Sequence, residues 1–196
     1  MVQPLAGKML LPVVGGSPAV WTTCMLFFQA ALLAGYAYAH AAAERLDVRR
    51  HAPLHLALAL APLVAAPSGP LGAPFSLPLD RAAAAGHPTL AVLWILAVTA
   101  GLPFFVVGAT SPLLQRWFAG TDHPDARDPY FLYSASNLGS LVALLGYPLI
   151  LEPRLGLAAQ ARGWAWGYAL LVALLAACGV ATARRRAAAP AASEPS

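Results

Sequence analysis

The sequence predicts an all-α fold, a polytopic transmembrane helical bundle with five spans and a partial helix at its N-terminus. Hydrophobic residues make up 59% of the 196 residues and charged residues 10%, whereas soluble domains are typically about 25% charged. Such a chain has too little polar surface to cover a fold in water. The second observation is five apolar stretches without Asp, Glu, Lys or Arg, which cover residues 18–43, 53–66, 89–114, 130–151 and 164–182.

The opening segment, residues 1–14, is apolar apart from Gln3 and Lys8 and ends at Pro12 and Gly15, which stop a helix. It is too short to cross a bilayer, and it lacks the regions of a signal peptide. We expect a partial or truncated first membrane helix, because half a spanning helix would leave backbone groups unsatisfied in lipid. A short interfacial helix is the alternative.

The transmembrane domain is predicted to cover residues 18–182. A helix needs about 20 residues to cross the hydrocarbon core, and four of the five stretches are long enough. The stretch at 53–66 is marginal and crosses only if its flanks are drawn in, giving residues 51–67. Ser17 and Asp128 each precede a proline and are predicted to cap the helices that follow.

The connections are predicted from composition. Residues 67–88 contain repeated Pro and Gly without apolar periodicity, which indicates an irregular outer loop. Residues 183–196 are basic and then rich in Ala and Pro, and we expect a disordered cytoplasmic tail.

The distribution of arginine predicts the orientation. If residues 1–14 lie in the membrane, eight arginines share a side with the C-terminus and three lie on the other side. The first group is Arg45, Arg49, Arg50, Arg116, Arg127, Arg184, Arg185 and Arg186, and the second is Arg81, Arg154 and Arg162. Because basic residues accumulate on the cytoplasmic side, the C-terminus is predicted to be cytoplasmic.

Few polar residues fall within the predicted spans, and none at mid-depth is ionisable. This absence argues against an ion-coupled transporter, which usually needs such a group. Amides occur at Gln29 and Asn137, and each needs a partner. Ser134, Ser136 and Ser140 surround Asn137, and small residues at this spacing favour close helix packing. A polar contact to a substrate or cofactor is the alternative.

Gly101 and Pro103 predict a kink and a candidate hinge, because proline removes a backbone hydrogen bond.

Site chemistry is otherwise absent from the sequence. It holds none of the glycine-rich nucleotide motifs and no nucleophile elbow, so no catalytic residue and no cofactor are expected. His51 and His55 lie four residues apart without a third ligand nearby, so no metal is expected and an interfacial role is favoured. The basic residues form no stripe for phosphate contacts, which argues against nucleic acid. Cys24 and Cys178 are expected to lie too far apart for a disulfide.

Several runs of the sequence together resemble the membrane region of bacterial fused MFS/spermidine synthase-like proteins. They are residues 2–12, GGSPAVWTTC at 15–24, FFQ at 27–29, SPLLQRWF at 111–118, DPYFLY at 128–133, SNLGS at 136–140, EP at 152–153 and LGL at 155–157. The resemblance covers residues 2 to about 180 and implies a multi-pass protein of the bacterial inner membrane. In that family a cytoplasmic aminopropyltransferase-like domain follows the membrane helices, and this sequence has no counterpart of it, so no catalytic residue is carried over.

Two functions from different classes remain. The first is a non-catalytic membrane module that serves a spermidine synthase-like partner, a soluble aminopropyltransferase-like protein, as an anchor or a small-molecule conduit. The alternative is a permease for a polyamine or a similar solute, although a path for cations without a buried carboxylate is hard to defend. An enzyme within the membrane ranks lowest, and the oligomeric state and any substrate stay open.

Overall fold

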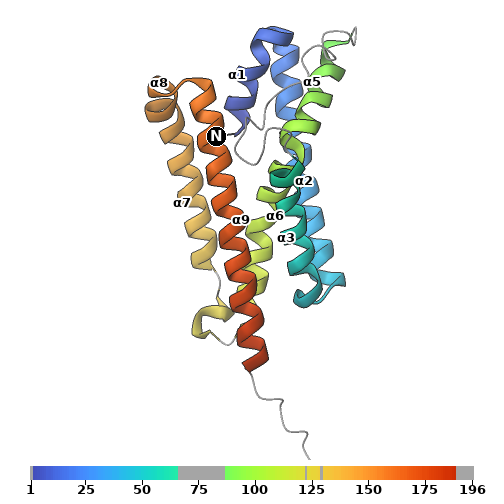
Figure 1. Ribbon diagram of the computed structural model, residues 1–196, viewed down its shortest axis with the longest axis vertical. Helices are drawn as coiled ribbons and strands as arrows, with labels where there is room; N and C mark the ends of the chain where they lie inside the picture. Colours follow the sequence, from blue (N-terminus) through green and yellow to red (C-terminus); the bar gives the residue numbers. More distant parts are fainter. Residues whose placement is uncertain (1, 66–86, 122, 129, 189–196) are drawn as a thin grey trace, which may run out of the picture.

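The computed structural model describes residues 2–65, 87–121, 123–128 and 130–188, and in these residues the chain is a bundle of helices without a strand (Figure 1). The long helices α2 (Pro18–Arg45), α3 (Val48–Ala65), α6 (Leu102–Ala119), α7 (Tyr130–Gly146) and α9 (Leu157–Ala188) run along its long axis. The short helices α1 (Val2–Val14) and α5 (Pro88–Leu96) lie toward one end of the bundle. The predicted all-α class is confirmed.

Four helical stretches of the described residues are long and apolar enough to cross a membrane, and they are Pro18–Arg45, Thr89–Ala119, Tyr130–Arg154 and Leu157–Ala181. The fifth predicted span, residues 51–67, is not confirmed as a crossing segment. Its helix α3 has 18 residues but includes Arg49 and Arg50 and two histidines, which lower its apolar character. Most of the predicted outer loop, 67–88, lies outside the described residues, and α5 already begins at Pro88.

The ends of the bundle differ in what they hold. We call the end with the α2–α3 turn, the α6–α7 connection and the C-terminal end of α9 the tail end, and the opposite end the α1 end (Figure 1). The three segments that the arginine count places on one side of the membrane thus share one end of the fold. This arrangement agrees with the predicted alternation of the helices. Which end of the bundle faces the cytoplasm stays a prediction.

The predicted helix starts are present. The Oγ of Ser17 accepts a hydrogen bond from the backbone N–H of Val20 at 3.4 Å, and Pro18 begins α2. Asp128 Oδ1 accepts from the backbone N–H of Tyr130 at the start of α7. Between α1 and α2, Gly15 has φ +77, a left-handed conformation that costs glycine little, and its N–H donates to Leu11 O.

Two irregular turns of the helices occur next to prolines. A π-helical turn, η1 (Ala97–Gly101), joins α5 to α6 just before Pro103, and a second, η3 (Tyr147–Leu151), joins α7 to the short α8 (Glu152–Arg154). Because proline lacks the N–H that a regular turn needs, a local wide turn lets the helix continue past it. The α6–α7 connection contains a 3₁₀ turn, η2 (Pro124–Arg127).

The last helix is longer at both ends than predicted. The expected span began at Trp164 and ended at Thr182, whereas α9 begins at Leu157 and continues to Ala188. Alanine and arginine are strong helix formers, so the arginine run extends the helix. The rest of the predicted tail, residues 189–196, lies outside the described residues.

Two apolar clusters form the core. One lies toward the α1 end, where Leu5 and Leu10 of α1 pack with Phe28 of α2 and Ile95 of α5. An aromatic contact further stabilises this cluster, because the rings of Phe28 and Phe104 meet edge to face with 4.8 Å between their centroids. The other cluster lies toward the tail end and joins α2, α3, α6 and α9. Because Leu5 and Leu10 of α1 are buried in the first cluster, the opening segment is an integral part of the bundle.

The backbones of α2 and α6 approach each other closely at glycines. A Cβ built on Gly35 would lie 2.8 Å from the carbonyl oxygen of Phe105, and one built on Gly108 would lie 3.1 Å from the side chain of Leu32. Only hydrogen fits at Gly35, so this glycine sets the separation of the two helices. The contact was not anticipated from the sequence.

Candidate functional site

The predicted intramembrane polar residues lie on the outside of the bundle. Gln29 is exposed on α2, and Ser134, Ser136, Asn137 and Ser140 are exposed on α7. Figure 1 shows α2 and α7 on opposite sides of α6 and α9. The structure therefore gathers the α7 residues on one helix but does not bring Gln29 to them.

The face of α7 around Asn137 is uncovered along its length. Ser140 lies four residues after Ser136 and three after Asn137, so the three residues share one side of the helix, which we call the α7 polar face. No residue of α7 is buried, and a Cβ on Gly139 would meet no heavy atom within 4 Å. Ser140 Oγ donates to the carbonyl oxygen of Ser136 within the helix.

The candidate hinge residues lie inside the fold. Pro103 is buried in the first turn of α6, and Gly101 closes the π-helical turn. A Cβ on Gly101 would lie 3.4 Å from the ring of Phe27, an ordinary contact. The irregular turn is therefore where the sequence predicts a kink, and motion at this point stays a prediction.

Two buried histidines were not identified as core residues from the sequence. His51 and His55, one turn apart on α3, have exposed fractions of 1% and 0%. The indole N–H of Trp117 on α6 donates to His51 Nε2 at 2.7 Å, and His51 Nδ1 lies 3.1 Å from Leu46 O. Since Nε2 accepts, Nδ1 must carry the proton and donate to the carbonyl, so His51 is neutral in this arrangement.

The second histidine continues this polar network. Thr110 Oγ1 donates its only proton to Val106 O at 2.7 Å, so it accepts from His55 Nε2 at 3.2 Å. Tyr38 of α2 stacks on His55 with 5.9 Å between ring centroids. The hydroxyl of Tyr168 on α9 donates to Ala59 O of α3 at 3.0 Å. These contacts fix α3 to α6 and α9, and the spacing of the two histidines was the one sequence signal for them.

A polar pocket of about 470 Å³ opens at the tail end. The end of α2 contributes Glu44 and Arg45, the turn that follows contributes Asp47, and the end of α6 contributes Arg116; His51 of α3 also lines the pocket. Its polar lining distinguishes it from the apolar surface of the helices. The tail-end pocket is the first of two cavities described here.

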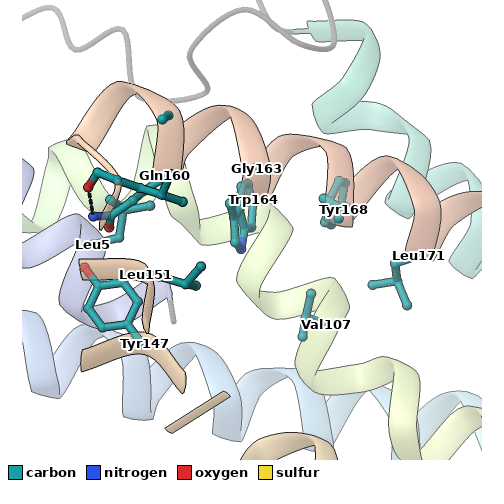
Figure 2. A pocket seen from close by; sticks show the side chains of 12 residues that line it. Leu5, Val107, Tyr147, Leu151, Gln160, Gly163, Trp164, Tyr168 and Leu171 are labelled. Atoms are coloured by element: carbon teal, nitrogen blue, oxygen red, sulfur yellow. Dashed lines mark hydrogen bonds between the residues drawn. The ribbon is translucent and has the colours of Figure 1, made fainter. Parts of the chain in front are cut away.

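The second cavity is a mostly apolar cleft of about 400 Å³ along α9, which we call the α9 cleft (Figure 2). Its lining includes Leu5 of α1, Val107 of α6, Tyr147 and Leu151 of η3, and Gln160, Gly163, Trp164, Gly167, Tyr168 and Leu171 of α9. None of the predicted site residues lies in it.

Among the described residues, no three His, Cys, Asp or Glu side chains group as a metal site. Cys24 is buried in α2, whereas Cys178 is exposed on α9. No protein-family model, curated protein or solved structure matches the chain. The two cavities and the α7 polar face are the features of the described residues that bear on function.

Proposed function

We propose that this chain is a non-catalytic integral membrane module that serves a spermidine synthase-like, aminopropyltransferase partner as an anchor or small-molecule conduit. The observation that carries the proposal is the tail-end pocket. It combines exposed Arg45 and Arg116 with Glu44 at one end of an otherwise apolar bundle. Charged side chains around a concave surface suit a soluble protein partner, because they give orientation and specificity.

The α7 polar face supports a role in a larger assembly. Amide and hydroxyl groups are poorly solvated in hydrocarbon. They are stabilised when their helix packs against another polar helix surface. Asn137 and Ser136 are exposed on the outside of the bundle, where no helix of the described residues covers them. The resemblance described above supplies the identity of the partner, and the predicted orientation puts the tail end in the cytoplasm with it.

The permease is the less favoured candidate. A path for a polyamine needs polar groups that converge on one passage, whereas Gln29 and Asn137 lie on separate outer surfaces. The α9 cleft contains neither of them and has no carboxylate in its lining. These positions favour the module over the permease.

Co-purification from membranes in mild detergent tests the proposal. The native chain should retain an aminopropyltransferase, identified by mass spectrometry and by transfer activity in the eluate. The charge-reversal variant Arg45→Glu/Arg116→Glu should lose most of that activity, because it replaces both arginines of the pocket with acidic residues and leaves its charged lining entirely acidic. Arg162→Glu is the matched control, an exposed arginine near the start of α9 at the opposite end of the bundle. An eluate without transferase activity from the native chain would contradict the proposal.

A further inference from the structure

The α9 cleft contains two buried polar atoms without a partner. Gln160 and Tyr147 have exposed fractions of 8% and 5%, and neither Gln160 Oε1 nor the Tyr147 hydroxyl has a hydrogen-bond partner among the described residues. Gln160 Nε2 donates to Leu155 O at 2.7 Å, which fixes the amide so that Oε1 is the free acceptor. Buried polar groups are nearly always paired, so two such atoms in one cavity indicate a missing ligand.

The polar atoms occupy one end of the cleft. In Figure 2 the amide of Gln160 and the hydroxyl of Tyr147 lie toward the same end, and Val107 and Leu171 lie toward the other. Gln160 is near the start of α9 and Tyr147 is in η3, so this end is the α1 end of the bundle. The rest of the lining is apolar and points to a hydrocarbon occupant.

The length of the cleft matches one leaflet of a bilayer. Eleven residues of α9 separate Gln160 from Leu171, which is about 16 Å at the rise of an α-helix. The hydrocarbon core is about 30 Å thick, so a cleft of this length that began at the interface would reach the middle of the membrane. Ala159, Gly163 and Gly167 form its α9 wall with little side chain, and Cβ atoms on both glycines would meet nothing within 4 Å.

We propose that the α9 cleft binds one acyl chain of a membrane lipid whose head group carries a hydroxyl. The hydroxyl donates to Gln160 Oε1 and accepts from the Tyr147 hydroxyl, and the chain lies against Leu151, Val107 and Leu171. An ester only accepts and cannot donate to Gln160 Oε1, whereas an ammonium could donate to both oxygens but would find no carboxylate in the cleft lining to balance its charge. Lys8 of α1 and Glu152 of α8 form an ion pair at this end of the bundle, so neither charge is left to select an ionic head group.

Fluorescence quenching on the purified full chain tests this proposal without any partner protein, so it can fail while the proposed function stands, and the reverse. The probe is a diacylglycerol with brominated acyl chains at low mole fraction in phosphatidylcholine nanodiscs. Bromine quenches nearby indoles, and Trp164 lines the cleft. Quenching should saturate in the native chain, and the saturable part should disappear in Trp164→Phe.

The head-group hydroxyl is tested with the 3-O-methyl ether of the same brominated lipid. It carries a methyl group in place of the hydroxyl proton and should bind about fivefold to tenfold more weakly, the loss of one hydrogen bond to a buried acceptor. In Gln160→Leu the diacylglycerol and the ether should bind equally weakly, and Tyr147→Phe should also weaken the diacylglycerol. Equal binding of the two lipids to the native chain would overturn the assignment, since a water molecule would then satisfy the amide.

The cavity itself is tested with a filling substitution. Gly163→Leu places a side chain in the cleft and should abolish saturable quenching, whereas Gly179→Leu should not. Gly179 is the matched control, a glycine of the same helix that also has no heavy atom within 4 Å of its Cβ position and lies outside the cleft. Quenching of Gly163→Leu at the native level would overturn the proposal. So would the absence of saturable quenching in the native chain, the result expected if a second copy of the chain covers the cleft.

Discussion

The indole N–H of Trp117 donates a 2.7 Å hydrogen bond to Nε2 of His51, a residue 66 positions earlier in the chain. Both side chains are buried, with exposed fractions of 3% and 1%. The bond joins the first turn of α3 to the end of α6 and lies beside the tail-end pocket.

Replacing Trp117 by Phe should destabilise the bundle. The variant leaves His51 Nε2 buried without a donor, which costs about 1 to 3 kcal/mol. Thermal melting of the detergent-solubilised protein measures the loss. Trp166→Phe, at an exposed position of α9, is the control and should melt near the native temperature. Equal melting of both variants would show that the bond does not stabilise the fold.

Tyr168→Phe removes the hydroxyl that donates to Ala59 O and should loosen α3 from α9. The expected loss is about 0.5 to 1.5 kcal/mol for one hydrogen bond, with a further cost for the unpaired carbonyl. The measurement is unfolding in SDS titrations, with Tyr36→Phe as the control because Tyr36 is half exposed on α2. A stabilised Tyr168→Phe variant would contradict the contact.

Gly35→Ala should separate α2 from α6. Its Cβ would lie 2.8 Å from a backbone oxygen that cannot rotate away, and such overpacking costs about 1 to 3 kcal/mol. Gly139→Ala in α7 is the matched control, since its Cβ would meet open space and alanine favours a helix over glycine by about 0.5 to 1 kcal/mol. The two variants should therefore shift the melting temperature in opposite directions.

Lys8→Met should have a small effect. Lys8 and Glu152 tie α1 to α8, but both side chains are partly exposed, 31% and 40%. Ion pairs open to water contribute about 0 to 1 kcal/mol, so the melting temperature of the variant should be close to that of the native chain. The small difference between the two should decrease as salt is added. A loss of several kcal/mol would instead place this pair within the hydrocarbon region.

Labelling of introduced cysteines tests the predicted orientation. In a Cys24→Ala/Cys178→Ala background, Gly156→Cys between α8 and α9 should react with a membrane-impermeant maleimide in intact cells. Asp47→Cys in the α2–α3 turn should react only after permeabilisation. The reverse pattern would invert the bundle and move the tail-end pocket out of the cytoplasm.

Local sequence signals predicted the helices well. Ser17 caps α2, and the irregular turn before Pro103 occurs where proline removes a backbone donor, because both effects depend on neighbouring residues. Of the five apolar stretches predicted to cross a membrane, four lie in helices long and apolar enough to do so. The stretch at 53–66 is marginal because it is short, and His51 and His55, for which the sequence favours an interfacial role, are buried inside the bundle.

The candidate site could not be predicted in the same way. His55 meets Thr110 and Tyr168 meets Ala59 across 55 and 109 residues, and no local pattern encodes such partners. Gln160 was not singled out because it sits in the first turns of α9, a segment the sequence assigns to a loop. Asn137 was expected to pack against a helix, and whether another protein covers it depends on residues outside this chain.

The glycine contact between α2 and α6 also constrains how the bundle can move. With backbone lying on backbone, these two helices can neither slide nor tilt independently without collision, so they form a rigid unit. Helix α7 has no buried side chain to hold it. Because η3 supplies Tyr147 and Leu151 to the α9 cleft, a displacement of α7 and η3 relative to this unit would change the width of the cleft.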